Sequence, residues 1–571
     1  MKKVKVKMHR KPKTERIFNP VSNIGDMLRE IKGHGEHPLF TYFTVDHQLA
    51  DISYTEFYEM IRAAAAELTE MGYAGKKLAV SGETSPEWLC MYLAILAIGG
   101  VAIPMDRELA PGEFAGFLKW VKADGFCYAP SLQKAADAVR ESGLEDMLFI
   151  SFDSKSSPEY AVSVEILIER GRAVENYEFP DMSDKTEELA EYLFTSGTTG
   201  SSKCVMLSQK NIFSVVTSAC ATVDFNPDDT VVSVLPMHHT YELACTLAEM
   251  VYGVHICIND SLSHTVRNFQ RFRPTGLVLV PLFLYTMHKK IWSEARSKGK
   301  ENTLKLGIIA SGTMKAVGVD VRRRIFAEVL EAFGGRLEKI ICGGAALDPI
   351  MIEAFENFGI SVYEGYGITE CAPLTAVTPY YARKYGSVGC SVPCCEISID
   401  ATGEGEHGYP EGEILIHGDN VMLGYYDNQE ANEEVFTEDG SFRTGDVGYL
   451  DDDGYLFITG RKKSVIVLEN GKNVFPEEIE EYLGHIDQIA ECVVVGREES
   501  ENKITLTAIV YPNYDMLPKD ADEETVIRII EQAVASVNRK LPTFKRVMKV
   551  ELRSSEFEKT SAKKIKRYLL S

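Results

Sequence analysis

Short apolar runs alternate with longer segments of helical periodicity through the first part of the chain. The apolar runs have the length of β-strands and lie at residues 78–82, 100–105, 125–129, 148–153, 231–236, 276–281 and 340–345. Segments with a helical pattern lie between them at 55–71, 112–123 and 318–333. Because the strand-like runs are apolar on both faces, this alternation predicts an α/β fold of mostly parallel sheets covered by helices.

The pattern changes after about residue 385, where the strand-like runs become shorter and are bounded by turns. Asp452-Asp453-Gly454 separates two such runs. An Asp-Gly pair between two strand-like runs predicts a hairpin turn. The sequence therefore predicts a β-rich lobe from about residue 385. We expect this lobe to belong to a large N-terminal domain that spans residues 1–460.

The last part of the chain has the pattern of a separate unit. A helix opened by Pro476, two strand-like runs and a long helix near 522–540 predict a small, separate α+β domain at residues 461–571. This segment contains 19 basic and 19 acidic residues, so it is neutral. The acidic excess of the chain therefore lies entirely in residues 1–460.

Composition and charge narrow the class of protein. The 571 residues exceed what one hydrophobic core usually organises, so we expect at least two domains. An apolar fraction of 45% and a charged fraction of 25% are typical of globular proteins and exclude a wholly disordered or fibrous chain. The net charge of −23 argues against nucleic-acid partners, whose binding depends on neutralised phosphates.

Cysteine usage and the apolar runs bear on location. Twelve cysteines are scattered through the chain, which suits a reducing cytoplasm better than a disulfide-stapled secreted protein. The longest uncharged run, Trp88–Pro104, is short for a membrane span and contains Gly99-Gly100, so it predicts a buried helix followed by a strand. Residues 1–16 are basic, as a solvated tail or a segment touching an anionic surface would be. We predict a cytoplasmic chain with at most peripheral membrane contact.

The strongest chemical signal lies at residues 192–203, where an apolar strand end leads into a loop of glycines and hydroxyl side chains. The loop comprises Thr195, Ser196, Gly197, Thr198, Thr199 and Gly200, and Lys203 follows it. Glycines let backbone N–H groups approach an anion, hydroxyls donate further hydrogen bonds, and lysine supplies a positive charge. The loop therefore predicts a polyphosphate site. Because it lacks the Gly-Lys-Ser/Thr ending of a P-loop, a P-loop NTPase is disfavoured.

At this loop the sequence resembles the adenylate-forming, acyl-activating superfamily, with Ser202 at the position of a usual proline. Six further segments resemble that family in the family's order, at 235–242, 342–347, 365–370, 442–446, 460–464 and 559–567. The resemblance implies an enzyme that activates a carboxylate with ATP as an acyl-adenylate and then transfers the acyl group to a thiol. No protein nucleophile is needed for that chemistry.

The resemblance also implies roles for individual residues. Tyr366 would stack on adenine, Asp446 would bind the ribose, and Arg461 would reach the ribose or the phosphate. The implied ATP-binding set is Thr195, Ser196, Gly197, Thr198, Thr199, Gly200, Lys203, Gly344, Ala345, Tyr366, Gly367, Asp446 and Arg461. The implied catalytic set is Lys564, Thr369, Glu370 and His239. Glu370, with Thr195, would hold Mg²⁺, which prefers oxygen ligands.

Two positions in the implied mechanism concern the small domain. Lys463 occupies the hinge position, about which the family rotates this domain between the two half-reactions. Alignment on Ile565 and Arg567 makes Lys564 the implied catalytic lysine. Lys563 stands where the family has glycine, so the choice between the two lysines stays open.

His239, in the large domain, would line the acyl pocket. The alternative is a histidine whose hydrogen bonds are satisfied within the core.

The segments at 235–242 and 342–347 resemble the long-chain fatty acyl-CoA synthetase branch of the family. They imply an AMP-forming long-chain fatty acid–CoA ligase that uses ATP, Mg²⁺ and coenzyme A. An acyl carrier protein as thiol acceptor is one alternative, and an inactive nucleotide-sensing or scaffold protein on the same fold is another. Residues 280–285 are apolar, as either an acyl pocket or a core requires, so the acyl chain length cannot be read from them.

Overall fold

The computed structural model describes residues 19–570 apart from 45, 154–156, 196–201, 406, 469–472, 501–502, 520 and 560–564. One large sheet has the strand order β19-β9-β8-β4-β3-β5-β6-β7 and is parallel except at its β8–β9–β19 edge. Its strands are β3 (Lys77–Ser81), β4 (Val101–Met105), β5 (Gly125–Tyr128), β6 (Leu148–Ser151), β7 (Val162–Ser163), β8 (Leu189–Thr195), β9 (Lys203–Ser208) and β19 (Gly424–Tyr425).

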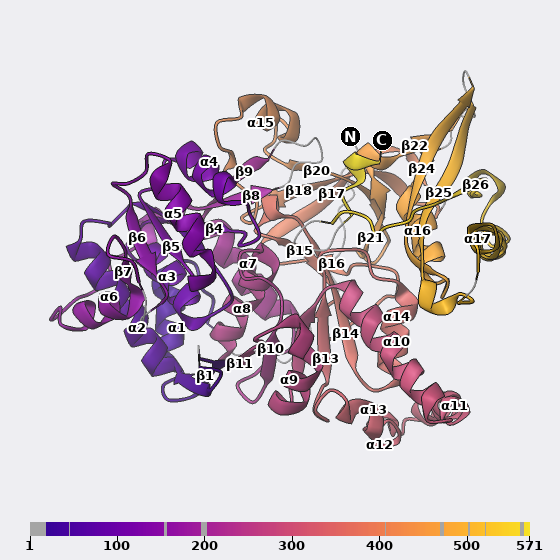
Figure 1. The fold of residues 1–571 in the computed structure, drawn as a ribbon, viewed down its shortest axis with the longest axis horizontal. Helices are drawn as coiled ribbons and strands as arrows, with labels where there is room; N and C mark the ends of the chain where they lie inside the picture. The colour runs from indigo at the N-terminus through magenta and orange to yellow at the C-terminus, as the bar shows by residue number, and fades with distance from the viewer. Residues whose placement is uncertain are drawn as a thin grey trace.

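A second large sheet has the order β16-β15-β14-β13-β12-β10-β11-β1-β2, with a parallel centre and antiparallel edges. Its strands are β1 (Pro38–Phe43), β2 (Leu49–Ser53), β10 (Thr230–Ser233), β11 (His255–Ile258), β12 (Gly276–Leu279), β13 (Lys339–Cys342), β14 (Ser361–Gly367), β15 (Leu374–Val377) and β16 (Cys390–Ser391). Figure 1 shows the two sheets in the left and middle parts of the molecule, each with helices around it.

One continuous core joins the two large sheets. It runs through five helices that pack on one another, α1 (Ile24–Gly33), α2 (Tyr54–Glu70), α3 (Pro86–Ala97), α7 (Gln209–Thr222) and α8 (Thr240–Tyr252). The remaining helices of this body are α4 (Pro111–Val121), α5 (Gln133–Glu141), α6 (Val164–Arg172), α9 (Thr265–Phe272), α10 (Pro281–Ser297), α11 (Glu301–Ala316), α12 (Arg322–Ile325), α13 (Ala327–Glu331), α14 (Pro349–Asn357) and α15 (Gln429–Val435).

Helix α3 shows how local sequence and burial agree. The Ser85 side chain caps the helix by accepting a hydrogen bond from Trp88 N, and Pro86 fills the first helical position. Nearly every side chain of α3 is buried, as expected of a helix that is apolar all round. The predicted buried helix followed by a strand is thus confirmed. Within the described part of the chain, no helix combines the length and apolarity needed to cross a bilayer.

The β-rich lobe is a four-stranded antiparallel sheet with the order β17-β18-β20-β21. Its strands are β17 (Cys395–Glu404), β18 (Pro410–Gly418), β20 (Phe442–Leu450) and β21 (Leu456–Arg461). The predicted hairpin is confirmed, because Asp451 Oδ1 accepts hydrogen bonds from the backbone N–H of Asp453 and Tyr455 between β20 and β21. Strand β21 ends at Arg461, and the domain boundary between residues 460 and 461 stays a prediction.

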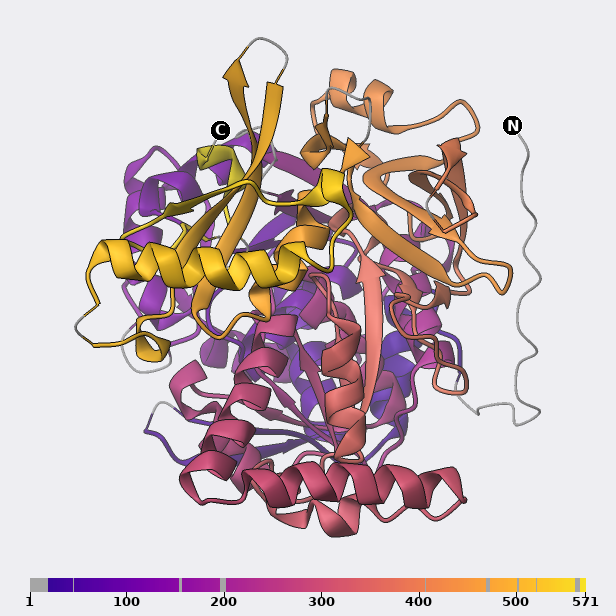
Figure 2. The ribbon, with the colours of Figure 1, turned by 90° about the vertical axis from the view of Figure 1, so that its right-hand side faces the viewer.

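The C-terminal part is a smaller α+β unit with a core of its own. It contains a two-stranded sheet, β22 (Ile466–Val467) with β23 (Asn473–Val474), and a three-stranded sheet, β24 (Ile489–Ser500), β25 (Lys503–Pro512) and β26 (Lys549–Leu552). Helices α16 (Pro476–Gly484) and α17 (Glu523–Asn538) pack against these strands. Figure 2 shows this unit, in yellow and light orange, at the upper left and in front of the body of the molecule.

The predicted α/β fold, with a large N-terminal domain and a smaller C-terminal α+β domain, is confirmed. One predicted element is wrong in detail, since the helix expected at 318–333 is broken into α12 and α13. The start is also late, since residues 318–321 are not helical: Gly318, with a φ of 85°, follows the end of α11, and Asp320 precedes α12. The Asp320 carboxylate accepts a hydrogen bond from Arg322 N and favours a turn there.

Helices α2 and α6 approach each other so closely that only glycine fits at one position. A Cβ atom on Gly171 would lie 1.8 Å from the carbonyl oxygen of Ala63. We expect Gly171→Ala to destabilise the protein by about 1–3 kcal/mol, because the helices must separate. The midpoint of thermal unfolding measures this effect.

Gly116→Ala is the matched control, because Gly116 is exposed in α4 and has nothing within 4 Å of the position of an added Cβ. Alanine there should stabilise the helix by about 0.5–1 kcal/mol. If both variants changed the unfolding midpoint in the same direction, the close approach of α2 and α6 would not be a constraint.

Candidate active site

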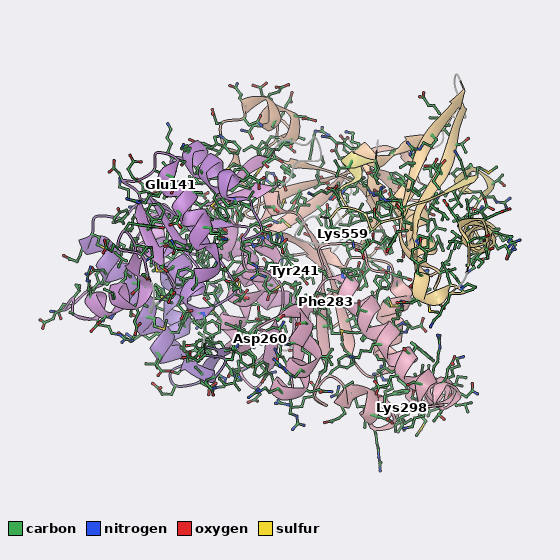
Figure 3. All side chains as sticks on the ribbon, viewed as in Figure 1. Glu141, Tyr241, Asp260, Phe283, Lys298 and Lys559 are labelled. Atoms are coloured by element: carbon green, nitrogen blue, oxygen red, sulfur yellow. The ribbon has the colours of Figure 1, made fainter. Side chains whose placement is uncertain are left out.

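A cleft of about 1270 Å³ is lined by residues from both large sheets, the β-rich lobe and the segment that leads into the small domain. The sequence-predicted residues that line it are Thr195, Lys203, His239, Gly344, Ala345, Gly367, Thr369, Glu370, Asp446, Arg461 and Lys463. Ser196, Gly197, Thr198, Thr199, Gly200 and Lys564 lie outside the described residues. Figure 3 labels Tyr241, Asp260 and Phe283, three lining residues of this cleft, near the middle of the molecule.

The predicted phosphate loop connects two antiparallel strands at the edge of a sheet. Strand β8 ends at Thr195, β9 begins at Lys203, and these two residues are register partners. Both line the cleft, so the sheet delivers a hydroxyl and an ammonium group to the same place. The Lys203 ammonium lies 4.4 Å from the centroid of the Tyr425 ring, within the range of a cation–π contact.

The end of β14 carries Thr369 and Glu370 into the cleft through a short 3₁₀ turn, Thr369–Cys371. This turn depends on Gly367, because a Cβ atom there would lie 1.5 Å from the carbonyl oxygen of Pro373. The end of β14 and the segment just before β15 therefore approach each other so closely that only glycine fits at position 367. The close approach fixes the position of the two polar residues that follow.

Glu370 is held by a residue that sequence reasoning missed. The Tyr425 hydroxyl donates a hydrogen bond of 2.8 Å to Glu370 Oε1. Burial, together with the Glu370 carboxylate, raises the pKa of Tyr425, so its hydroxyl remains a donor. No motif signals this contact, because Tyr425 lies on a separate two-residue strand, 55 positions along the chain.

The surroundings of Glu370 fit a magnesium ion shared with a nucleotide. Mg²⁺ is usually bound by one or two carboxylates together with phosphate oxygens and water. Glu370 supplies one carboxylate, and its Tyr425 bond occupies only part of the acceptor capacity. Across the described residues, no three His, Cys, Asp or Glu side chains gather into a metal cage. The donor set therefore suits an ion that arrives with its phosphate ligands.

Asp446 is a buried carboxylate at the wall of the cleft, with 4% of its surface exposed. The Tyr366 hydroxyl donates to Oδ2 at 2.7 Å, and Arg461 Nε lies 3.0 Å from Oδ1. Asp446 and Arg461 face each other in the β20–β21 pairing, so the hairpin fixes their contact. The ring of Tyr366 is buried beside a smaller cavity, and its stacking on adenine stays a prediction.

Two histidines lie where α8 begins. His239 occupies the N-cap position, and its ring centroid is 4.4 Å from that of His238. His238 Nε2 in turn lies 3.5 Å from Asp106 Oδ2. Both rings line the cleft, and they bring groups that can carry a proton or bind a carboxylate. The predicted place of His239 in the acyl pocket stays a prediction.

A second, smaller cavity of about 90 Å³ lies next to the cleft and shares Tyr241, Gly344, Gly367 and Pro373 with it. Its lining is almost entirely apolar. The hydroxyl of Tyr241 donates to Leu279 O at 3.2 Å and to Ile341 O at 3.1 Å, which fixes this ring between the two spaces. Sequence reasoning did not single out Tyr241, although it lies two residues after His239 in the same motif.

The small domain contacts the body through a histidine near the cleft. His485, which follows α16, forms an ion pair with Asp348, the buried N-cap residue of α14. The hydrogen bond to Asp348 raises the pKa of His485, and Glu481 adds to the rise. Near the hinge, Lys462 Nζ lies 3.0 Å from Glu413 Oε2. These contacts hold the small domain in the observed orientation.

We expect the contact between His485 and Asp348 to weaken as the pH rises. Because the pKa of His485 is raised above 6.5, the pair is fully formed below that value and is lost as the pH passes through the raised pKa. Fluorophores on the two domains should report increasing separation between pH 6 and pH 9. His485→Gln should abolish this dependence, whereas His407→Gln, in the β17–β18 turn, should preserve it. A pH dependence retained by His485→Gln would assign it to another group.

Two family models match the chain, "AMP-binding enzyme" over residues 29–426 and "AMP-binding enzyme C-terminal domain" over residues 463–570. Among curated proteins, the long-chain-fatty-acid–CoA ligase FadD15 of Mycobacterium bovis is 29% identical over 483 residues, which is 79% of this chain and 76% of that protein. The indoleacetate–CoA ligase of Aromatoleum aromaticum is 29% identical over 495 residues, which is 85% of this chain and 87% of that protein.

A solved structure supports the fold. The adenylation domain of a carboxylate reductase from Mycobacterium chelonae matches with a TM-score of 0.80, covering 96% of this chain and 89% of that one. The sequence identity is 22%, so this likeness concerns the fold alone. Both the body and the small unit described above are included in that match.

Proposed function

This chain belongs to the AMP-binding enzyme family, and we propose that it is an ATP-dependent ligase that joins a carboxylic acid to coenzyme A through an acyl-adenylate. Acyl-CoA ligase activity of this kind is supported by the family and by both curated relatives. The observation that carries the proposal is the cleft, which gathers Lys203, the Thr369–Glu370 turn and the Asp446–Arg461 pair.

The chemistry explains why such a cleft is needed. A carboxylate oxygen attacks the α-phosphorus of ATP, a P–O bond forms, and the bond to the pyrophosphate oxygen breaks. Two anions must meet, so the site has to supply positive charge before the reaction begins. Lys203, Arg461 and Lys463 line the cleft and supply that charge. A bound Mg²⁺ would add charge neutralisation at the phosphates.

In this proposal Asp446 accepts hydrogen bonds from the ribose hydroxyls, while Tyr366 and Arg461 hold its carboxylate in place. Thr369 binds the phosphate that becomes AMP, and Glu370, oriented by Tyr425, holds Mg²⁺. For Ser196, Gly197, Thr198, Thr199 and Gly200 the assignment to the phosphates rests on the sequence resemblance. Rotation of the small domain about Lys463 would then admit the thiol.

The acid enters beside the adenylate site. The shared walls Tyr241, Gly344 and Gly367 make the apolar cavity the proposed acyl pocket. The similarity to FadD15 supports a long-chain fatty acid, and the equal identity to the indoleacetate ligase supports an aryl acid as a second candidate. The cavity measures about 90 Å³, whereas a cavity of roughly 150 Å³ holds one benzene molecule. A long chain would therefore have to enlarge it.

Acid-dependent exchange between ATP and labelled pyrophosphate tests the proposed function. We expect exchange with at least one carboxylic acid in a panel that runs from short to long fatty acids and includes arylacetic acids. The acid with the highest kcat/KM identifies the substrate class. ATP binding without exchange for any acid would instead favour the nucleotide-sensing or scaffold alternative.

The two C-terminal lysines provide a test of the catalytic assignment, with each variant as the other's control. Lys564→Ala should lower adenylation by about 10²–10³-fold, because a charge that stabilises the transition state is lost. Discharge of preformed adenylate to coenzyme A should survive in the same variant. Lys563→Ala should leave both steps close to wild type. The reverse result would make Lys563 the catalytic residue, and equal loss of both steps would contradict the two-conformation mechanism.

The thiol acceptor requires its own measurement. Coenzyme A is the proposed acceptor, and an acyl carrier protein is the alternative that uses the same adenylate. Single-turnover discharge of preformed adenylate should be faster with coenzyme A than with a phosphopantetheinylated carrier protein. A faster reaction with the carrier protein would replace the proposed acceptor while leaving the adenylation step intact.

A further inference from the structure

Helix α8 presents one face to the small cavity. The lining residues of α8 are Tyr241, Ala244, Cys245, Ala248, Glu249 and Tyr252, which recur at the three- and four-residue spacing of one helical face. Such a face is normally apolar where it borders an apolar space. Glu249 departs from this pattern, because it places a carboxyl group in the wall of a cavity whose other surfaces are mainly hydrocarbon.

The Glu249 carboxyl is buried and incompletely satisfied. The residue is 3% exposed, and its Oε1 atom has no hydrogen-bond partner. Burial raises the pKa of Glu249 well above its usual value, and the nearby carboxyls of Glu242 and Asp229 raise it further. Both effects favour the protonated form, and a protonated carboxyl can both donate and accept a hydrogen bond. Buried polar atoms without a partner are rare in native structures, so this one requires an explanation.

Neighbouring polar groups already have partners within the protein. The Tyr241 hydroxyl donates to Leu279 O and Ile341 O, and the Tyr252 hydroxyl donates to Val223 O at 2.9 Å. No basic side chain lines the cavity among the residues that the structure describes. Glu249 is thus left with hydrogen-bonding capacity that these neighbours do not use.

The position of Glu249 relates it to the proposed chemistry. Tyr241 borders both the cleft and the cavity, and Glu249 follows eight residues later on the same helix. At a rise of 1.5 Å per residue, this separation is about 12 Å along α8. An acyl group that enters from the cleft past Gly344 and Gly367 would therefore meet Glu249 at its far end.

We propose that Glu249 recognises the end of the substrate remote from its carboxylate, and that the preferred acid bears a neutral hydrogen-bonding group there, such as a hydroxyl. This inference rests on the proposed function. A methyl-ended chain would leave the carboxyl unpartnered, whereas a hydroxyl would satisfy it within the apolar pocket. A cationic end group is disfavoured, because it would create a buried ion pair with no further polar groups around it.

Pairs of acids with equal numbers of heavy atoms test this proposal in the pyrophosphate exchange assay. Each pair contains an ω-hydroxy acid and the straight-chain acid whose terminal methyl replaces the hydroxyl, over lengths from four to twelve carbons. At the best length, we expect the wild type to favour the hydroxy acid at least tenfold in kcat/KM. Glu249→Leu should reverse this preference, and Glu249→Gln, which keeps hydrogen-bonding groups, should retain it.

Glu191→Gln is the matched control, because Glu191 is also a buried glutamate but lies on β8 and receives a hydrogen bond from Tyr92. It should leave the ratio between the two acids unchanged. Glu249→Leu should unfold at or above the wild-type temperature, since it replaces an unpartnered carboxyl with an apolar group. If Glu249→Leu fails to fold, Glu249→Met serves as the apolar variant.

The outcomes separate the two proposals. Exchange with methyl-ended acids that equals or exceeds exchange with hydroxy acids at every length would overturn the role of Glu249 and leave the ligase function standing. The same conclusion would follow if an apolar variant kept the wild-type ratio, as expected were Glu249 satisfied by a trapped water molecule. Absence of exchange with any acid would instead overturn the ligase function itself.

Discussion

The need to bring two anions together, in a chain with a net charge of −23, governs the arrangement of the proposed site. The acidic body supplies Asp446 and Glu370, and each of these carboxylates is bound by a neighbouring hydroxyl, from Tyr366 and Tyr425 respectively. Positive charge gathers where the β-rich lobe meets the small domain, at Arg461 and the lysines that follow it. The junction between the domains is therefore also the place where a polyphosphate can be neutralised.

Strand pairing, rather than loop conformation, positions most of the described site. Thr195 and Lys203 are register partners, as are Asp446 and Arg461, so a one-residue slip would turn the side chains of either strand to the opposite face. Gly367 adds a steric constraint where β14 meets the segment before β15. These supports precede the proposed hinge in the chain, so the proposed rotation of the small domain would leave them in place.

The sequence predicts the fold and the cleft well where its signals are local. Apolar runs identify the central strands, and the segments at 365–370 and 442–446 contain residues that the structure places around one cleft. Contacts between distant segments leave no such signal. Tyr425 reaches Glu370 from a two-residue strand, and the break after α11 depends on Gly318 and Asp320 inside an otherwise helical pattern. Pattern periodicity does not encode either contact.

Burial alone does not distinguish a structural carboxyl from one that serves a ligand. Burial raises the pKa values of Glu191 and Glu242 to about 8, yet each accepts a side-chain hydrogen bond, from Tyr92 and Ser233 respectively. Glu191, Glu242 and Glu249 each have one buried oxygen without a partner, but Glu249 lines the apolar cavity and receives no side-chain hydrogen bond from any described residue. A polar group buried in this way destabilises the empty protein, so a partner that supplies the missing hydrogen bond binds more tightly than an apolar group of the same shape. The pocket thus favours a polar end group through the same physics that makes Glu249 unfavourable for folding.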